Sequence, residues 1–197
     1  MALEDLGRRS SPQRADSRDS RTRLIDAVGA FANEHQHRPI RLSDLTTLAG
    51  VSPATAYRHF TSADDAINAF LARLPERAVE LFDANAKEVT GPIERLHQWN
   101  EAWVASCRSF SAVSVGLRST EGFLARRKRG EPVVRFVCDA VEPLLRPLTK
   151  DPTALLLVWN AVSDPREVLD MAKTLRWSAA RSARFITDTV TGAATPS

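Results

Sequence analysis

The sequence is poor in lysine, in cysteine and in long apolar stretches. Its 27 basic residues include four lysines, at positions 87, 128, 150 and 173, which leaves 23 arginines. The longest apolar run, Ala154–Trp159, is far shorter than the ~20 residues of a membrane-spanning helix. The polar N-terminus, residues 1–23, lacks the apolar core of a signal peptide. We therefore expect a cytoplasmic protein that does not associate with a membrane.

Residues that carry catalysis or bind metals are also sparse. Cys107 and Cys138 stand in apolar surroundings and form no CxxC pair, so we expect buried free thiols. A redox switch is the alternative, and it requires the two thiols to reach disulfide distance. The sequence has no phosphate-cradling glycine loop, GxSxG or HExxH motif. His35 and His37, two residues apart, point to different sides of a helix. We therefore expect no enzyme activity, no metal and no cofactor.

Apolar residues recur at helical spacing from Ser20 onward, and no segment alternates with period two. This pattern predicts an all-α protein in three parts, with a disordered basic and polar arm over residues 1–19. A small helical domain over 20–72 and a larger one over 73–197 follow. The boundary falls inside a helix that Ser62 and Asp65 begin with a capping-box pattern and that Pro75 bends or ends.

Residues 42–60 have the pattern of two short helices joined by a tight turn. Gly50 can adopt the positive φ that stops a helix, and Ser52 and Pro53 suit the start of the next one. Ala56 and Phe60, four residues apart, are expected to face inward. The first of these helices is expected to bury Leu42, Leu45, Leu48 and Ala49. The second exposes hydroxyl, guanidinium and imidazole groups, which suits the major groove of DNA.

These features resemble the helix-turn-helix of the TetR family of transcription regulators. The resemblance rests on the Ala-Gly-Val-Ser turn at 49–52, on the Tyr-x-His-Phe arrangement at 57–60, and on Phe31 in the first helix. It covers roughly residues 22–71. It implies an N-terminal three-helix DNA-binding domain with a helix-turn-helix, fused to a helical dimerisation and ligand-binding domain. It also implies a repressor that a small-molecule effector releases from a palindromic operator in double-stranded DNA.

The resemblance assigns DNA contacts residue by residue. Tyr57 and His59 would contact phosphates, and Arg58 is the strongest candidate for reading a base. The residues nearest the base edges would be Pro53, Ala54, Thr55 and Arg58, after Ser52 at the helix start. Arg41 and Ser43 would hold the DNA backbone. Ala63 departs from the basic residue that is common in the family at the start of the fourth helix.

The C-terminal part is expected to form a homodimer through its last helices and an effector site for a small apolar or aromatic molecule. Ordinary core is the alternative, because aromatic residues at helical spacing usually form core. The candidate ligand-binding residues are Trp99, Trp103, Cys107, Phe110, Phe123 and Phe136, with Trp159 nearby. The candidate dimer residues are Leu155, Leu156, Val158, Trp159 and Val162, and then Ala179, Ser182, Ala183, Ile186 and Val190.

Two alternatives and one further expectation follow from the sequence. Arg8, Arg9, Arg14 and Arg18 form either an arm that touches DNA or a solvated tail. The basic run at 126–129 is expected to be a solvated face. The functional alternative is a helical interaction module that has lost specific DNA binding, which Ala63, the acidic residues after it and the low net charge allow.

Overall fold

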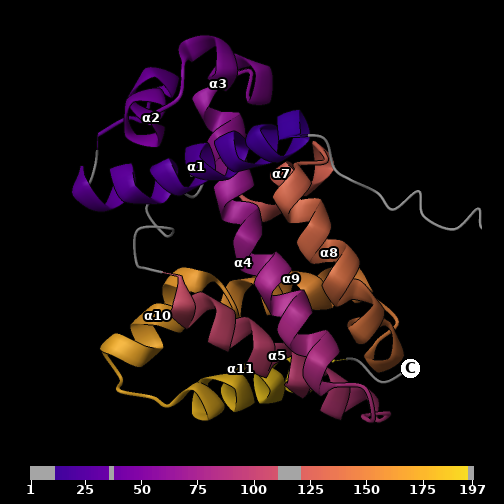
Figure 1. The fold of residues 1–197 in the computed structure, drawn as a ribbon. Coiled ribbons are helices and arrows are strands. Elements are labelled where there is room, and N and C mark those ends of the chain that lie inside the picture. Colours follow the sequence, from indigo (N-terminus) through magenta and orange to yellow (C-terminus); the bar gives the residue numbers. More distant parts are fainter. Residues whose placement is uncertain (1–11, 36–37, 111–120, 195–197) are drawn as a thin grey trace, which may run out of the picture. The chain divides into compact units, whose positions relative to one another are not determined.

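The structure is a computed structural model that describes residues 12–35, 38–110 and 121–194 (Figure 1). Every regular element within these residues is a helix, which confirms the predicted all-α class. None of the helices described has the length and apolar character of a membrane-spanning segment. The chain divides into two compact units that meet between Phe70 and Leu71, inside helix α4 (Ala63–Asn85).

The first unit contains α1 (Pro12–Glu34), α2 (Leu42–Ala49), α3 (Pro53–His59) and the start of α4. Its core is made of side chains that all four helices contribute, including Leu24, Leu45, Ala56 and Ala66. Helices α1 and α4 approach closely at Gly29, where an added Cβ would lie 2.8 Å from the Phe70 ring. A side chain at this position would force the Phe70 ring to shift, so Gly29 matters for packing rather than for backbone freedom.

Helix α1 begins earlier than the sequence pattern predicted. It starts at Pro12, so the expectation of a disordered arm is wrong for residues 12–19. Proline suits the first helical position, and the Ser20 hydroxyl donates to the Asp16 carbonyl oxygen at 2.8 Å. Arg23 and Asp19 form an i,i+4 ion pair, which favours the helix. Residues 1–11 of the expected arm lie outside the described residues.

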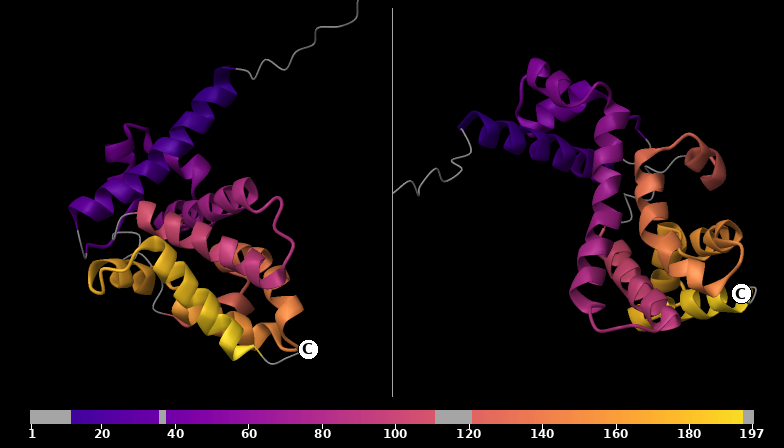
Figure 2. Two further views of the ribbon diagram at one scale, coloured as in Figure 1. Left: turned by 90° about the horizontal axis from the view of Figure 1, so that it is seen from below. Right: turned by 90° about the vertical axis from the view of Figure 1, so that its right-hand side faces the viewer.

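The second unit contains the remainder of α4 and the helices that follow it: α5 (Pro92–Ser109), α7 (Phe123–Lys128), α8 (Pro132–Leu145), η1 (Arg146–Leu148), α9 (Pro152–Val162), α10 (Pro165–Lys173) and α11 (Ala179–Ala193). Helix α5 is central and packs against α8, α10 and α11. Figure 2 shows α11 running alongside α5. Trp99, Trp103 and Trp159 cluster in the core, with the rings of Trp103 and Trp159 edge to face at 5.3 Å.

The structure excludes one of two outcomes expected at Pro75 and contradicts one burial prediction, and packing explains both. Pro75 was expected to bend or end the helix, and it does not end α4, which continues to Asn85. Proline removes one backbone hydrogen bond, but the flanking Leu74 and Ala78 are buried in the core of the second unit. Their burial favours continuation of the helix. Leu48 is 46% exposed instead of buried. Thr46 is buried in its place, with its hydroxyl donating to the Ser43 carbonyl oxygen at 2.7 Å.

Candidate DNA interface and ligand cavity

Helix α3 is held by a side-chain cap at its start and by apolar anchors along one face. The Ser52 hydroxyl accepts a hydrogen bond from the Thr55 backbone N–H at 3.1 Å. Pro53 occupies the first turn, where its missing N–H costs nothing. Ala56 and Phe60 are buried, as the sequence predicted. This short helix is therefore fixed by local contacts and by two anchors, which leaves its other face free of any packing role.

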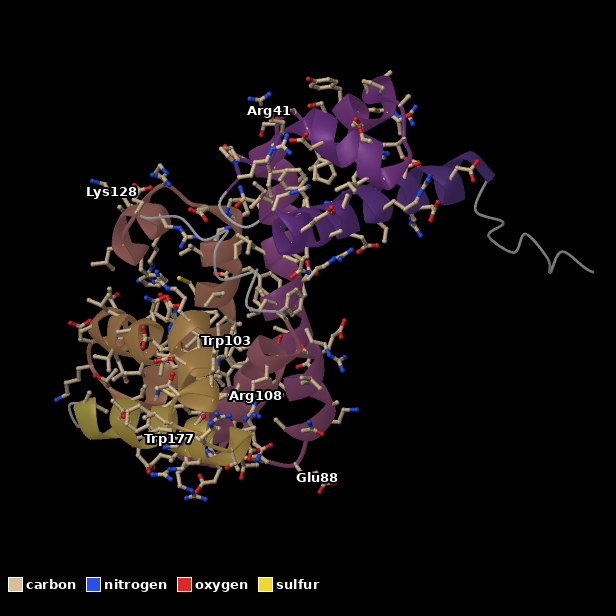
Figure 3. All side chains as sticks on the ribbon, turned by 90° about the vertical axis from the view of Figure 1, so that its left-hand side faces the viewer. Arg41, Glu88, Trp103, Arg108, Lys128 and Trp177 are labelled. Atoms are coloured by element: carbon tan, nitrogen blue, oxygen red, sulfur yellow. The ribbon has the colours of Figure 1, made fainter. Side chains whose placement is uncertain are left out.

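The outward face of α3 carries the candidate DNA-binding side chains. Tyr57 is 65% exposed and Arg58 is also exposed. Ser52, Pro53 and Ala54 are exposed, whereas Thr55 and His59 are half-buried. Arg41 and Ser43 are exposed at the start of α2, and Figure 3 shows Arg41 at the surface of the first unit. All nine candidates therefore belong to one unit, on α2, α3 and the turn between them.

The turn before α3 is closed by backbone hydrogen bonds that need a left-handed residue. Gly50 has φ 61° and ψ 40°, a conformation that suits glycine. The Val51 N–H donates to the Thr46 carbonyl oxygen at 3.1 Å, as in a Schellman C-cap. Arg23 of α1 adds a bond from Nη1 to the Ala49 carbonyl oxygen at 3.2 Å. Local geometry and one contact from α1 thus set the angle between α2 and α3.

His59 differs from the other candidates because its ring is partly withdrawn from solvent. Its Nε2 is buried and has no hydrogen-bond partner within the described part of the chain. Burial lowers the pKa of His59 below its ordinary value, and the positive charges of Arg58 and Arg21 lower it further. The imidazole is therefore neutral near pH 7, so a contact with a phosphate would use a single N–H donor rather than a full charge.

Arg21 was not among the sequence candidates. It is exposed on α1, and its guanidinium lies 5.3 Å from the centroid of the Phe60 ring. That cation–π contact holds a positive charge beside the end of α3. A basic residue one turn before Leu24 was a weak sequence signal, because only the fold brings α1 against the end of α3.

At the start of α4, Asp65 forms hydrogen bonds with the residues just before the helix. The Asp65 N–H donates to the Ser62 hydroxyl at 3.1 Å, as the capping-box pattern predicted. The Asp65 carboxylate accepts from the backbone N–H of Thr61 at 3.0 Å and also from the Thr61 hydroxyl. The hydroxyl bond to Thr61 is the main reason that the pKa of Asp65 is lowered. This turn is therefore negative, where the resembled family often has a basic side chain.

No protein-family model matches the sequence, and no curated protein matches it significantly. Solved structures do match. A fatty acid degradation regulator, FadR from Bacillus halodurans, superposes with a TM-score of 0.68 at 15% identity, over 90% of this chain and 97% of that one. A TetR family transcription regulator from Marinobacter aquaeolei gives 0.61 at 12% identity, over 94% and 99%. The multidrug binding protein EbrR, solved with imidazole, gives 0.56 at 21% identity, over 86% and 93%.

This chain has the TetR fold. The likeness extends over both units, since nine-tenths of the chain or more is covered by the first two of these structures. The resemblance noted in the helix-turn-helix is thereby confirmed for the fold.

The second unit of this TetR fold contains a partly open cavity of about 610 Å³, counting its open part. Helices α4, α5, α7, α8, α9 and α10 all contribute to its wall. Apolar side chains predominate, with the aromatic rings of Trp103, Phe123 and Trp159 among them. Polar groups come from Arg126, Asn160, Ser163 and Asp164. A concave, mainly apolar site with a few polar groups is typical of small-molecule binding.

The six candidate ligand residues are divided between this cavity and other places. Trp103 and Phe123 line the cavity, and Figure 3 shows Trp103 among the helices of the second unit. Trp99 and Cys107 are buried in the core, and Phe110 packs partly buried against it. Phe136 is 37% exposed. The apolar residues of α5 therefore divide between the cavity wall, where Trp103 lies, and the core, where Trp99 and Cys107 lie, because several helices surround α5.

The basic run at 126–129 is a solvated face, as expected, only at Lys128 and Arg129, which are exposed, whereas Arg126 is buried and Arg127 half-buried. Arg126 is buried and forms a two-pronged ion pair with Glu131, across the turn at Gly130. Arg127 pairs with Glu142 of α8, and Arg129 with Glu121. Lys128 is exposed, and Figure 3 shows it pointing outward. The prediction is wrong for Arg126 and Arg127, because their acidic partners, Glu131 and Glu142, lie outside the run itself.

Most of the side chains expected to form the dimer are part of the core of the single chain. In α9 and α11 the buried ones are Leu155, Leu156, Trp159, Ser182, Ala183, Ile186 and Val190. Val158, Val162 and Ala179 also pack partly buried against this core. The expectation is wrong for the seven buried side chains, because α9 and α11 turn their apolar faces toward the rest of their own unit. Their outward faces instead carry Leu157 and Phe185, both exposed.

Both cysteines are buried thiols outside any disulfide, as expected, and burial raises the pKa of the Cys138 thiol. Within residues 12–35, 38–110 and 121–194, no group of three His, Cys, Asp or Glu side chains gathers to hold a metal ion.

Proposed function

We propose that this chain is a sequence-specific DNA-binding transcription regulator that inserts α3 into the major groove. The observation that carries the proposal is the outward face of α3. Tyr57 and Arg58 are exposed, and neither forms a hydrogen bond or ion pair within the described residues, while Ala56 and Phe60 anchor the same helix. The fold therefore leaves a phenol and a guanidinium available on a rigid short helix.

The chemistry of these groups suits DNA. Arg58 is the candidate for base readout, because a guanidinium donates two parallel hydrogen bonds to guanine. Tyr57 donates its hydroxyl to a phosphate, a contact that positions the protein without reading sequence. Arg41, Ser43, Ser52, Thr55 and His59 are expected to add backbone contacts around these two. A homodimer would present two copies of α3 to a palindromic operator with half-sites about 34 Å apart.

The single tyrosine of the chain supplies a sharp test. Incorporation of 3-fluorotyrosine places one 19F nucleus on the outward face of α3. We expect the resonance to shift on addition of the intergenic duplex beside the protein's own gene, and to stay in place with a scrambled duplex at equal salt. Specific binding without any 19F shift would show that another surface contacts DNA.

A matched pair of variants separates specific contact from net charge. Arg58→Gln should weaken binding to the specific duplex by roughly 1–3 kcal/mol per half-site, measured by fluorescence anisotropy. Arg135→Gln removes the same charge from an exposed position on α8 and should leave binding unchanged. Equal losses in both variants would mean that Arg58 acts only through the overall charge.

The cavity of the second unit is the proposed effector site, and its occupant would release the protein from DNA as an inducer releases a repressor. Its mainly apolar wall supports a small apolar or aromatic effector. Two structural neighbours, a fatty acid degradation regulator and a multidrug binding protein solved with imidazole, are consistent with this proposal. The effector acts if it binds the DNA-free conformation more tightly than the DNA-bound one.

Dimerisation is proposed through the outward faces of α9 and α11. Phe185 is 40% exposed and its ring meets that of Trp177 edge to face at 5.3 Å, while Leu157 is exposed on α9. Phe185→Glu should convert a dimer to a monomer in analytical ultracentrifugation and weaken DNA binding. Ile93→Glu, on an exposed apolar residue of α5, is the matched control and should leave the dimer intact.

The alternative is a protein-interaction module that has lost DNA binding, and the start of α4 favours it. Ala63, Asp64 and Asp65 make the first turn of α4 acidic, where a phosphate contact would need a basic group. Equal, weak binding to specific and scrambled duplexes at all salt concentrations, with no 19F shift, would support this alternative over regulation.

A further inference from the structure

One polar corner of the cavity is built around Arg126. The side chain is 6% exposed and yet lines the cavity. Its Nε donates to Glu131 Oε2 at 2.8 Å, and its Nη2 donates to Glu131 Oε1. These bonds use one edge of the guanidinium. Its Nη1 makes no hydrogen bond with any residue that the structure describes, so two N–H donors are left for an occupant of the cavity.

The charges around this corner are already balanced. Glu131 neutralises Arg126, and Arg129 approaches the same carboxylate at 3.7 Å. Asp164, on the cavity wall, forms a two-pronged pair with Arg166 and caps α10 through the Arg166 N–H. An entering carboxylate would therefore meet a guanidinium whose charge is matched, and would add an uncompensated negative charge in a mostly apolar site.

The aromatic walls have no spare polar groups to offer. The Trp103 indole N–H donates to the Ser163 carbonyl oxygen at 2.7 Å, and the Trp159 indole N–H donates to Asn100 Oδ1 at 2.9 Å. Both rings therefore present only apolar surface to the cavity. The body of a ligand has to be apolar, and its oxygen belongs at Arg126.

We infer that this cavity takes an uncharged apolar molecule with a carbonyl-type oxygen, which accepts a hydrogen bond from Nη1 of Arg126. An ester, ketone, lactone or amide meets this description, and a carboxylate does not. The inference rests on the proposed effector site and specifies the chemical class of its ligand. The Arg126–Glu131 pair selects that class, because it retains a strong donor while removing the net positive charge.

The test uses three probes that share one phenyl-alkyl body: methyl 4-phenylbutanoate, 4-phenylbutanoate and n-butylbenzene. All four tryptophans belong to the second unit and two of them line the cavity, so quenching of tryptophan fluorescence reports binding to the full-length protein. At pH 7.5 we expect the ester to bind about tenfold more tightly than either of the other two, because a good hydrogen bond in a dry site gives about that factor.

Two double variants identify the residues responsible. Arg126→Met with Glu131→Gln removes the donor without leaving an unpaired buried carboxylate, and should abolish the preference for ester over n-butylbenzene. Arg127→Met with Glu142→Gln removes a neighbouring ion pair that does not line the cavity, and should retain the preference. If the first double variant unfolds, Arg126→Lys, which moves the donor and keeps the charge, should lower the ester affinity with the fold intact.

The outcomes separate this inference from the proposed function. Carboxylate binding as tight as ester binding would overturn the ligand class and leave the effector site standing. Ester binding that leaves DNA affinity unchanged would support the ligand class and contradict effector release. A failure of all three probes to bind would overturn the inference, as would an equal loss of preference in both double variants.

Discussion

Asn100 connects the cavity wall to two other helices through buried hydrogen bonds. It lies on α5 and is fully buried. Its Oδ1 accepts from the Trp159 indole N–H at 2.9 Å, and its Nδ2 donates to the Thr187 hydroxyl oxygen at 3.0 Å. Thr187 in turn donates to the Ala183 carbonyl oxygen at 2.9 Å. One amide therefore fixes the positions of α5, α9 and α11 relative to each other.

The cost of Asn100→Ala follows from which groups lose their partners. Thr187 retains its bond to Ala183, so its hydroxyl stays satisfied. The indole N–H of Trp159 is buried and loses its acceptor, which costs roughly 1–3 kcal/mol. Loss of the amide's packing adds to this, and we expect a fall of about 2–4 kcal/mol in the free energy of unfolding of the second unit. Asn85→Ala, an exposed asparagine on α4, should change it by less than about 0.5 kcal/mol.

Urea denaturation followed by tryptophan fluorescence measures this unit selectively, because the first unit contains no tryptophan. A double-mutant cycle with Trp159→Phe isolates the hydrogen bond, since phenylalanine has no N–H to leave unpaired. The double variant should be more stable than the sum of the single effects predicts, by about 1–2 kcal/mol. Strict additivity, or a cost for Asn100→Ala no greater than that for Asn85→Ala, would refute the reasoning.

Three further predictions concern the first unit. Gly50→Ala should destabilise this unit by about 1–2 kcal/mol in hydrogen exchange, because alanine is strained at a φ of 61°. Steric crowding does not contribute, since the nearest atom to an added Cβ lies 3.9 Å away. Gly122→Ala, at φ −65°, is the control and should be near neutral. His59 has a lowered pKa, so its neutral form stabilises the fold fully above the unfolded pKa of about 6.5. That stability is lost as pH falls through the lower folded value. His59→Gln should therefore reduce the loss of thermal stability between pH 7.5 and pH 5.5, and an unchanged loss would exclude His59 as its source. Arg21→Ala should weaken binding to all duplexes alike and reduce the slope of log affinity against log salt by about one; an unchanged slope would mean that Arg21 only packs on Phe60.

Much of the helix-turn-helix was predictable because short-range rules govern it. Gly50, Ser52 and Pro53 each suit one backbone position, and the spacing of Ala56 and Phe60 fixes which face of α3 is buried. These rules involve residues within one or two turns of each other, so the sequence contains all the information they need.

The same local rules fail where packing over longer distances competes with them. Pro75 would end an isolated helix, but burial of the residues around it extends α4 to Asn85. Leu48 fits the apolar spacing of α2, yet it is exposed while Thr46 is buried. A hydroxyl that bonds to its own helix can be buried at low cost, so the position of the neighbouring helices decides which side chain faces inward.

The sequence by itself determined the helical class and the face of α3 that is free for a partner. Only the tertiary structure decided which aromatic side chains line the cavity and which fill the core, because α5 is surrounded and its apolar residues face several neighbours. It also decided that Arg126 is buried against Glu131 and that the apolar faces of α9 and α11 belong to the core of their own chain. Helical periodicity identifies a buried face, but only the three-dimensional arrangement of the other helices identifies what covers it.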